Sequence, residues 1–269
     1  MNIKQGPSMV RVALLGAAGR MGAQILETAR DYPGVCISAA LVRSGSPLLG
    51  QALNGIVCSA DLERTLVGSD VLVGFSTPSS ISVAIDACLA ARKPIVIGVT
   101  GLDATLRQKM ANAGRHVAVL ASPNMSLGAT LLLQLARTAA AVLGDEFDSE
   151  ITDTHHSGKN DSPSGTALAL GEAVAEGRGV ILGERAVFAR HGQNGARQPG
   201  SIGFTSVRGG DIVGDHTLMF AGPAERLELT HRAQSRAAFA RGALAAARWI
   251  AGKPAGLYNM ADVLQVEAR

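Results

Sequence analysis

The chain has 269 residues, of which 47% are hydrophobic, and this is enough to bury one large core or two smaller ones. The formal net charge is only +3, and aromatic residues make up 3% of the chain. A nucleic-acid groove needs a concentrated basic surface and a base-stacking platform needs aromatic side chains, so neither class is indicated.

The cysteines and the apolar runs indicate in which cellular compartment the protein is found. The chain has three widely spaced cysteines and no C-x-x-C pair: Cys36, Cys58 and Cys88. This sparse set favours a reducing compartment. The first eight residues have no apolar stretch, so we expect no signal peptide, and the apolar run 127–144 has helical spacing and contains Gln134 and Arg137. We therefore expect a soluble, cytoplasmic protein without a nucleic-acid or membrane partner.

A glycine-rich segment follows the first predicted strand. Residues 9–15 are strand-like and lead directly into G-A-A-G-R-M-G, which runs from Gly16 to Gly22 and opens a helical pattern. A strand, a glycine-rich turn and a helix in this order favour dinucleotide binding. Gly16 then permits the tight turn, Gly19 lets a pyrophosphate approach, and Gly22 lets the helix pack closely. The strict G-x-G-x-x-G pattern fails at Ala18, and a tight turn without a ligand is the alternative.

The second predicted strand, 35–42, ends in Val42-Arg43-Ser44. Dinucleotide folds that hold NAD usually place an acid at this point to bind the ribose hydroxyls. An arginine without the acid favours the 2′-phosphate of NADP(H). The alternative is a solvent-exposed arginine.

Strands and helices continue to alternate up to residue 126. We expect a short helix from Asp61, strands at 71–76, 94–100 and 116–122, and helices at 79–92 and 103–114. Buried runs separated by helices predict an α/β fold in which a Rossmann-type parallel sheet is covered on both faces.

Small and polar residues follow every strand of this sheet, at the edge where such folds bind ligands. They are Gly16, Arg43, Ser76-Thr77, Gly98-Val99-Thr100 and Ser122-Pro123-Asn124. Turn chemistry alone can explain each one, but five in succession favour a cofactor site.

The pattern changes after residue 126. A long helix at 127–143 leads to a strand at 146–155 and a helix at 165–176, and 187–232 then reads as strands joined by glycine-rich linkers. This predicts a smaller α+β domain with a mixed or antiparallel sheet over 127–235. Within it, Arg208 and Asp211 fit either structural turns or a pocket.

The last segment, 236–269, begins with an alanine-rich helix at 236–251. A lone terminal helix must bury its apolar face, so we expect this segment to return to the first domain, 1–126.

The most unusual stretch is 150–167, E-I-T-D-T-H-H-S-G-K-N-D-S-P-S-G-T-A. A predicted strand delivers His155, His156 and Lys159 at its end, and a helix then begins at Ser164, a favourable N-cap residue. The first amides of a helix lack intrahelical partners and lie at the positive end of its dipole. Cationic side chains facing such amides suit a small dianion, such as a dicarboxylate.

Two residues after the cap fit this dianion site: Thr166 can add a hydroxyl donor, and Gly165 lets a ligand approach the backbone. An ordinary surface loop before a capped helix is the alternative. A zinc site is disfavoured, because adjacent histidines on a strand point to opposite faces and no third ligand has helpful spacing. We therefore expect no metal.

With these segments in place, the sequence resembles the 4-hydroxy-tetrahydrodipicolinate reductases, also called dihydrodipicolinate reductases, over essentially the whole chain. Residues 150–167 match the family signature E-I-x-E-x-H-H-x-x-K-x-D-x-P-S-G-T-A, with Asp153 for the second acid. Four other segments are similar to those of the family: G-A-A-G-R-M-G, I-G-V-T-G (97–101), V-R-G-G-D-I-V-G-D-H-T (207–217) and G-L-Y-N-M-A-D-V-L (256–264).

The resemblance implies an enzyme of the diaminopimelate route to lysine, which uses NADPH or NADH to reduce 4-hydroxy-tetrahydrodipicolinate to tetrahydrodipicolinate with loss of water. It implies a homotetramer in which the sheets of the second, substrate-binding domain join. The implied catalytic residues are His155 and Lys159, and the implied substrate-binding residues are His156, Lys159, Gly165 and Thr166. The implied cofactor-binding residues are Gly16, Ala17, Ala18, Gly19, Arg20, Met21, Arg43, Gly98, Val99, Thr100, Ser122, Pro123, Asn124 and Met125.

The chain departs from the family pattern at two positions. Val42 stands where members that use both cofactors tend to carry an acid, so NADPH is favoured, and Met125 stands where an aromatic residue is common. The remaining alternatives are another Rossmann dehydrogenase, a cofactor-binding sensor without turnover, and a metal hydrolase. A sensor has no need of two histidines and a lysine beside a helix N-terminus.

Overall fold

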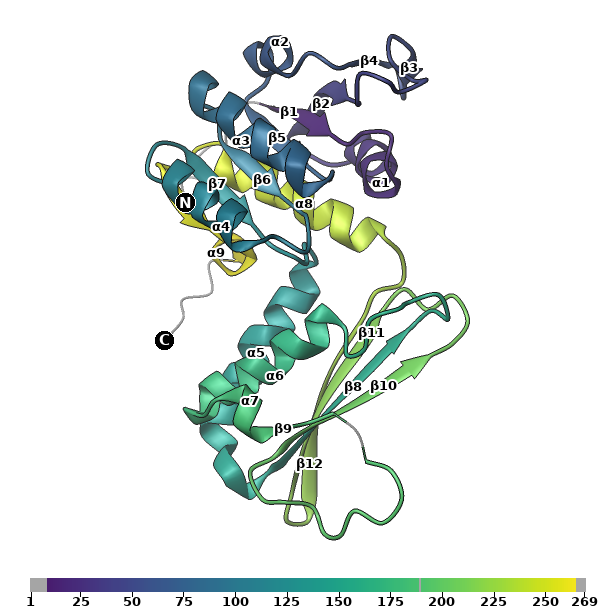
Figure 1. Cartoon of the computed structure of the whole chain (residues 1–269), viewed down its shortest axis with the longest axis vertical. Helices are drawn as coiled ribbons and strands as arrows, with labels where there is room; N and C mark the ends of the chain where they lie inside the picture. Colours follow the sequence, from purple (N-terminus) through teal and green to yellow (C-terminus); the bar gives the residue numbers. More distant parts are fainter. Residues whose placement is uncertain (1–8, 189, 265–269) are drawn as a thin grey trace, which may run out of the picture. The chain divides into compact units, whose positions relative to one another are not determined.

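The computed structural model describes residues 9–188 and 190–264. The chain forms two compact units (Figure 1). Of the described residues, 9–126 and 236–264 form unit 1, and the rest, within Leu127–Ser235, form unit 2.

Unit 1 is built on an eight-stranded sheet in the order β13-β7-β6-β5-β1-β2-β4-β3. The central strand β1 (Val10–Leu15) pairs in parallel with β2 (Val35–Leu41) on one side and with β5 (Val71–Gly74) on the other. The other strands are β3 (Ala52–Leu53), β4 (Ile56–Ser59), β6 (Ile95–Ile97), β7 (Ala118–Ala121) and β13 (Gly256–Tyr258). Among the described strands of this sheet, only the β3–β4 pair is antiparallel, so the predicted Rossmann-type parallel sheet is confirmed.

The helices of unit 1 explain why its strands are apolar throughout. They are α1 (Arg20–Ala29), α2 (Leu62–Val67), α3 (Pro78–Ala91), α4 (Ala104–Ala113), α8 (Ala237–Ile250) and α9 (Met260–Leu264). Helix α1 packs against α8, whereas α2, α3 and α4 contribute to a separate apolar cluster against the sheet. Strand residues such as Leu14, Leu72 and Ile95 are fully buried, as expected for a parallel sheet covered on both faces.

Side chains define where the helices of unit 1 begin. The Asp61 carboxylate accepts a hydrogen bond from the Arg64 amide at 2.9 Å, and the Asp103 carboxylate accepts one from the Leu106 amide at 2.7 Å. These are N-caps that satisfy otherwise unpaired amides. The short helix predicted from Asp61 is therefore confirmed.

Unit 2 contains a five-stranded sheet in the order β12-β11-β8-β10-β9. Strand β8 (Asp148–His155) runs parallel to β10 (Ile202–Arg208) and antiparallel to β11 (Asp215–Gly222), so the predicted mixed sheet is confirmed. The remaining strands are β9 (Ala186–Val187) and β12 (Glu225–Arg232).

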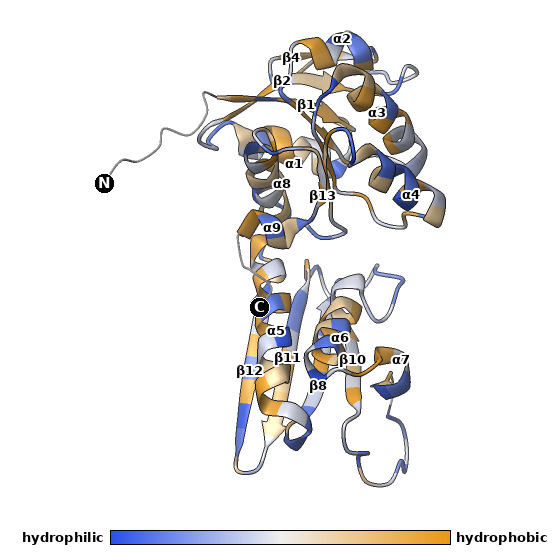
Figure 2. Ribbon diagram, turned by 90° about the vertical axis from the view of Figure 1, so that its left-hand side faces the viewer, coloured by the Kyte–Doolittle hydropathy of each residue, from blue (hydrophilic) through white to orange (hydrophobic). Residues whose placement is uncertain are grey.

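Helices α5 (Leu127–Leu143) and α6 (Gly165–Arg178) pack against the sheet of unit 2, as Figures 1 and 2 show. The alternating residues Ile151, Leu218 and Phe220 face these helices and are buried. The short helix α7 (Leu182–Arg185) lies outside our sequence prediction, because four residues carry no helical periodicity.

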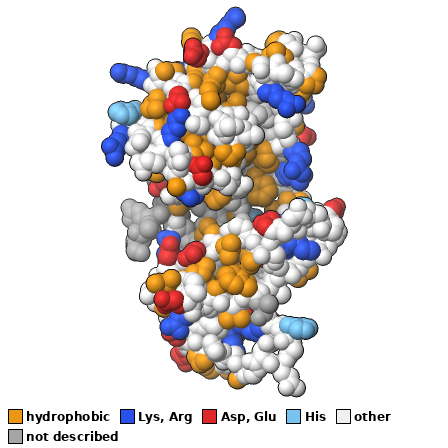
Figure 3. Space-filling view, viewed as in Figure 1, with side chains coloured by type: hydrophobic (Ala, Val, Ile, Leu, Met, Phe, Trp, Pro, Cys, Tyr) orange, Lys and Arg blue, Asp and Glu red, His pale blue; other side chains and the backbone are white. Residues whose placement is uncertain are grey.

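Helix α5 extends into a short 3₁₀ turn, and together Leu127–Glu146 are long and apolar enough to cross a membrane by length and composition alone. In the folded chain α5 packs against α6 and β12. Hydrophobic side chains remain at the surface of these two helices, at Leu131, Leu135 and Leu168, and Figure 3 shows hydrophobic patches on this half of the molecule.

Candidate functional site

The glycine-rich segment of unit 1 forms a tight turn, and the first residue of this turn must be glycine. Gly16 has a φ of +87°, in the left-handed region, and a Cβ atom there would lie 2.2 Å from the Phe75 carbonyl oxygen. The amides of Gly16 and Ala17 both donate to the Leu41 carbonyl at 3.1 Å, which ties the turn to the end of β2.

The amides at the start of α1 are suited to an anion. Gly19 is the N-cap and supplies no side-chain acceptor, and the amides of Ala18, Arg20 and Met21 have no acceptor among the described residues. Ala18, Gly19 and Arg20 are exposed. A Cβ atom at Gly22 would lie 2.2 Å from the Gly16 carbonyl oxygen, so this glycine lets α1 lie directly on the turn. Free amides at a helix N-terminus fit the pyrophosphate of NAD(P)H.

The ends of β2 and β6 lie at the same edge of the sheet as this turn. Arg43, directly after β2, is exposed, whereas Val42 is buried and offers no acid for ribose hydroxyls. A Cβ atom at Gly98 would lie 2.2 Å from the ring of Phe75, so this glycine makes room for an aromatic side chain at the edge. Val99 is buried and Thr100 is exposed.

The segment after β7 turns back on itself. The Ser122 hydroxyl donates to the Asn124 carbonyl at 2.7 Å, and the Asn124 side chain accepts from the Ser126 amide at 2.9 Å. Pro123 is exposed, whereas the side chain of Met125 is only 2% exposed. The side chain of Ala17 is fully buried as well. Among the predicted cofactor-binding residues, Ala17 and Met125 therefore present no side chain at the surface.

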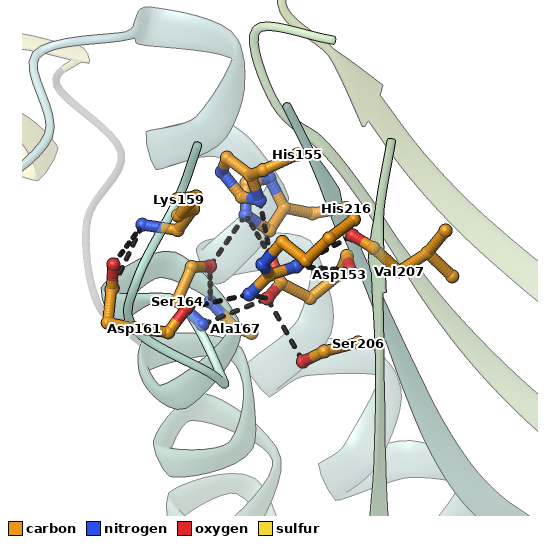
Figure 4. A network of polar contacts seen from close by, with 10 residues as sticks. Asp153, His155, Lys159, Asp161, Ser164, Ala167, Ser206, Val207 and His216 are labelled. Carbon is orange, nitrogen blue, oxygen red and sulfur yellow. Dashed lines mark hydrogen bonds and ion pairs between the residues drawn. The ribbon is translucent and has the colours of Figure 1, made fainter. Parts of the chain in front are cut away.

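Unit 2 contains a polar network centred on the buried Asp153 of β8, whose side chain is 1% exposed (Figure 4). Its Oδ2 atom accepts from the Ser164 amide at 2.9 Å, from the Arg208 guanidinium at 3.0 Å and from the Ser206 hydroxyl at 3.3 Å. The carboxylate therefore joins the ends of β8 and β10 to the start of α6.

Two histidines approach the other carboxylate oxygen, Oδ1. The Nδ1 atom of His155 lies 2.8 Å from it and the Nε2 atom of His216 lies 3.4 Å from it. The two rings meet edge to face with centroids 5.1 Å apart, and the His216 Nε2 atom is also 3.0 Å from the Ser164 hydroxyl. His216 is missing from the residues that we single out in the sequence. β11 brings His216 here from a distant part of the chain, so no local sequence pattern links it to His155. The only feature of the sequence that points to His216 is its place in segment 207–217, which is similar to the family.

Ser164 begins α6 as predicted. Its hydroxyl accepts from the Ala167 amide at 3.2 Å, and the Gly165 amide has no acceptor among the described residues. Gly165 is exposed and no atom lies within 4 Å of the position that a Cβ atom would take there, so a ligand can approach this backbone. Thr166 is half-buried beside it.

Lys159 lies in the loop between β8 and α6. Its ammonium group contacts both carboxylate oxygens of Asp161, at 2.7 and 2.9 Å, and its side chain is 19% exposed. This contact holds the pKa of Asp161 below its usual range. His156 is half-buried and donates its backbone amide to the Ile212 carbonyl at 2.8 Å.

The position of Arg208 decides between the two sequence interpretations. Its guanidinium group donates to the Asp153 carboxylate and to the carbonyl oxygens of Asp153 and Asp161, so it is a structural part of the network. Asp211 is exposed.

The electrostatics of the network follow from burial and charge. Burial opposes ionisation of Asp153, but the contacts from His216, Ser164 and Arg208 outweigh it and hold its pKa well below the usual range. Burial lowers the pKa of His155, and the positive charges of Lys159 and Arg208 lower it further. The negative charge of Asp153 opposes this shift and raises the pKa of His155.

Asp153, His155 and His216 each offer one ligand atom, and these atoms lie within 4.8 Å of one another. The Arg208 guanidinium, 3.0 Å from the same carboxylate, would repel a divalent cation. The expectation of a site without metal stays a prediction.

Comparison with known proteins agrees with the resemblance seen in the sequence. Two family models match the chain: dihydrodipicolinate reductase, N-terminus, over residues 10–125, and dihydrodipicolinate reductase, C-terminus, over residues 128–264. A 4-hydroxy-tetrahydrodipicolinate reductase of Thiobacillus denitrificans is 50% identical over 262 residues, which cover 95% of this chain and 98% of the relative. A second one, from Anaeromyxobacter dehalogenans, is 46% identical over 264 residues, which cover 95% and 98% of the two chains.

A solved structure supports the same assignment. The dipicolinate-bound dihydrodipicolinate reductase from Paenisporosarcina sp. TG-14 superposes with a TM-score of 0.76 at 25% identity and covers 93% of this chain and 97% of its own. The matches span both units, and the resemblance is confirmed. The chain belongs to the dihydrodipicolinate reductase family.

Proposed function

We propose that the protein is an NAD(P)H-dependent oxidoreductase that reduces 4-hydroxy-tetrahydrodipicolinate to tetrahydrodipicolinate and releases water, in the diaminopimelate route to lysine. The observation that carries this proposal is the grouping of His155, Lys159 and the N-terminus of α6 around one turn of unit 2. Relatives named for this reaction match nearly the whole chain.

The turn between β8 and α6 is the proposed dicarboxylate site. Lys159 supplies a positive charge, and Gly165 supplies an open backbone at the positive end of the α6 dipole. Thr166 is the proposed hydroxyl donor beside it. His156 is the proposed further donor to a carboxylate. A dicarboxylate fits this site because its two carboxylate groups need separate hydrogen-bond donors. Lys159, His156 and the start of α6 are the proposed donors.

His155 and Lys159 are the proposed acid–base residues. The overall reaction consumes one proton, and the 4-hydroxyl group leaves as water. A side chain that holds a proton near neutral pH and lies at the turn can supply that proton, and such groups typically accelerate reactions by about 10²- to 10⁴-fold. Histidine has the more suitable ordinary pKa, and the Lys159 ammonium group donates to Asp161.

Unit 1 is the proposed dinucleotide-binding domain, and bound NAD(P)H supplies the hydride. The amides of Ala18, Arg20 and Met21 would hold the pyrophosphate. Arg43, exposed after β2 with no acid beside it, favours the 2′-phosphate and hence NADPH over NADH. The edge residues at 98–100 and 122–125 complete the proposed cofactor site.

We further propose a homotetramer joined through the sheet of unit 2. Thr205, Thr152, Thr217 and Thr230 occupy one register row across four neighbouring strands. They lie on the face opposite to Ile151 and Phe204, which pack under α5 and α6. A uniform row of β-branched, weakly polar side chains fits pairing with another sheet. We place the protein in the cytoplasm and expect no nucleic-acid or membrane partner.

The test is an assay of cofactor oxidation. The purified protein is mixed with the fresh condensation product of pyruvate and aspartate semialdehyde, and oxidation of NADPH and of NADH is followed. The proposal predicts oxidation that requires this product and is faster with NADPH at low cofactor concentration. A folded protein that binds NADPH but oxidises neither cofactor would contradict the proposed reaction.

A further inference from the structure

Two buried polar atoms of unit 2 lie next to each other without a hydrogen bond. They are Oδ1 of Asp153 and Nδ1 of His155, 2.8 Å apart, on side chains that are 1% and 12% exposed. The distance is that of a strong hydrogen bond, but the ring is not turned to aim its N–H at the oxygen. Buried polar atoms are nearly always paired, and catalytic hydrogen bonds often align only when the ligand binds. A hydrogen bond between them would satisfy both atoms at once.

His155 is the nearer of the two histidines to this oxygen. The Ser164 amide and the Arg208 guanidinium both donate to Oδ2 and so fix the orientation of the carboxylate. His216 is the competitor for Oδ1, but its Nε2 atom is farther away, at 3.4 Å, and already lies 3.0 Å from the Ser164 hydroxyl.

We propose that Asp153 is a positioning residue that holds the His155 ring with its proton on Nδ1, so that Nε2 is the atom presented to the substrate. This inference rests on the proposed function and deepens it. A carboxylate beside one ring nitrogen fixes the tautomer, because the carboxylate only accepts hydrogen bonds and the neutral ring carries one N–H.

Gly214 lies close to the other ring nitrogen. A Cβ atom at this position would lie 2.9 Å from Nε2 of His155, and Gly214 does not have the left-handed backbone that would by itself require glycine. The chain thus places an acceptor at Nδ1 and a residue without a side chain beside Nε2, where any larger residue would crowd the nitrogen.

The charges that face His155 determine in which direction the pH profile of activity shifts when Asp153 is replaced. Asp153 raises its pKa, whereas burial and the facing groups His216, Lys159 and Arg208 lower it. When Asp153 is replaced by asparagine, the opposing negative charge is lost and the pKa of His155 falls further. If protonated His155 supplies the proton, activity in the variant is lost at a lower pH than in the wild type.

The first test reads the tautomer directly and needs no turnover. The full-length protein is labelled with ¹⁵N-histidine, and the His155 ring nitrogens are assigned with the variant His155→Gln. At a pH where the ring is neutral, we expect the proton on Nδ1 in the wild type. In Asp153→Asn, the side-chain oxygen of the asparagine can keep the contacts with Ser164 and Arg208. Its NH₂ group then donates to Nδ1 of His155. Nδ1 must therefore be unprotonated, and we expect the ring proton on Nε2. A wild-type ring protonated on Nε2 would overturn the proposal, whatever the enzyme catalyses.

The second test is kinetic. We expect Asp153→Asn to lower kcat by at least about 10-fold and to shift the basic limb of the pH profile to lower pH, with the KM for NADPH changed less than about threefold. Asp153→Glu keeps the carboxylate and is expected to recover most of the loss and the wild-type profile. Glu150→Gln is the matched control, because Glu150 lies on the other face of β8 and pairs with Arg190 and Arg197.

The outcomes separate this inference from the proposed function. An Asp153→Asn profile identical to that of Glu150→Gln would overturn the positioning role while the reductase assignment stands. A wild-type protein without reductase activity would overturn the proposed function, and the ring tautomer would then still decide the role of Asp153.

Discussion

Gly22 is packed tightly against backbone atoms of the proposed cofactor turn, and it gives a sharp prediction for Gly22→Ala. The added Cβ atom would lie 2.2 Å from the Gly16 carbonyl oxygen and 2.7 Å from both Cα and the carbonyl oxygen of Ala17. All three are backbone atoms, so no side-chain rotation can relieve the clash. Helix α1 must move away from the turn instead.

Two opposing terms set the change in the free energy of unfolding of Gly22→Ala. Alanine is favoured over glycine inside a helix by about 0.8–1.0 kcal/mol, and overpacking of a tight contact costs typically about 1–3 kcal/mol. All three contacts are with backbone atoms, so we take the upper part of the overpacking range and expect the free energy of unfolding to fall by about 1–2 kcal/mol. This corresponds to a fall in Tm of about 2–8 °C for a unit of this size. Movement of α1 also displaces the amides of Arg20 and Met21, so NADPH affinity falls by at least about 10-fold, the equivalent of about 1.4 kcal/mol.

The assay combines thermal unfolding without ligand and NADPH titration by calorimetry. Gly68→Ala is the matched control: Gly68 ends α2, has no atom within 4 Å of its Cβ position and has a negative φ of −87°. The control is expected to match the wild type in both measurements. Wild-type stability and wild-type NADPH affinity in Gly22→Ala would refute the packing argument.

Three further changes test other parts of the account. Lys159→Ala is expected to lose more than about 10-fold in turnover with NADPH affinity little changed, because the lysine lies in unit 2; unchanged turnover removes it from the mechanism. Arg43→Ala should weaken NADPH binding by about 10-fold and NADH binding by less than about twofold in parallel titrations, and an equal loss for both would contradict a 2′-phosphate contact. The pKa of Asp153 is lower in the folded than in the unfolded state, so its stabilisation is present above about pH 4 and is lost as pH falls further. Urea midpoints should therefore fall less steeply below about pH 4 in Asp153→Asn than in the wild type, and parallel curves would contradict this assignment.

The sequence predicted the larger elements because their periodicity is long. The helix expected at 127–143 is α5 to the residue, and the strand–turn–helix at Gly16 appears as expected. The short strands β3, β4 and β13 are absent from the sequence interpretation, because none of them lies in a continuous apolar run like those that contain β5, β6 and β7. These segments are strands because they form backbone hydrogen bonds with neighbouring strands of the sheet.

The candidate site was only partly predictable. The histidines and the lysine of the turn are adjacent in sequence, and Ser164 carries a local capping signal. The roles of Asp153 and His216 depend on contacts between β8, β10 and β11, which no local pattern encodes. The sequence interpretation also counted Met125 among the cofactor residues, and only the fold reveals that its side chain is buried.

The most direct test of the central claim is the mass of the product. The protein, NADPH and the fresh condensation product of pyruvate and aspartate semialdehyde are incubated, and the mixture is analysed by mass spectrometry. The account predicts one equivalent of NADP⁺ and a product that has the substrate's composition less one oxygen atom, which is the sum of reduction and loss of water. Oxidised cofactor with a product that has gained two hydrogens and kept its oxygen, or no product at all, would contradict it.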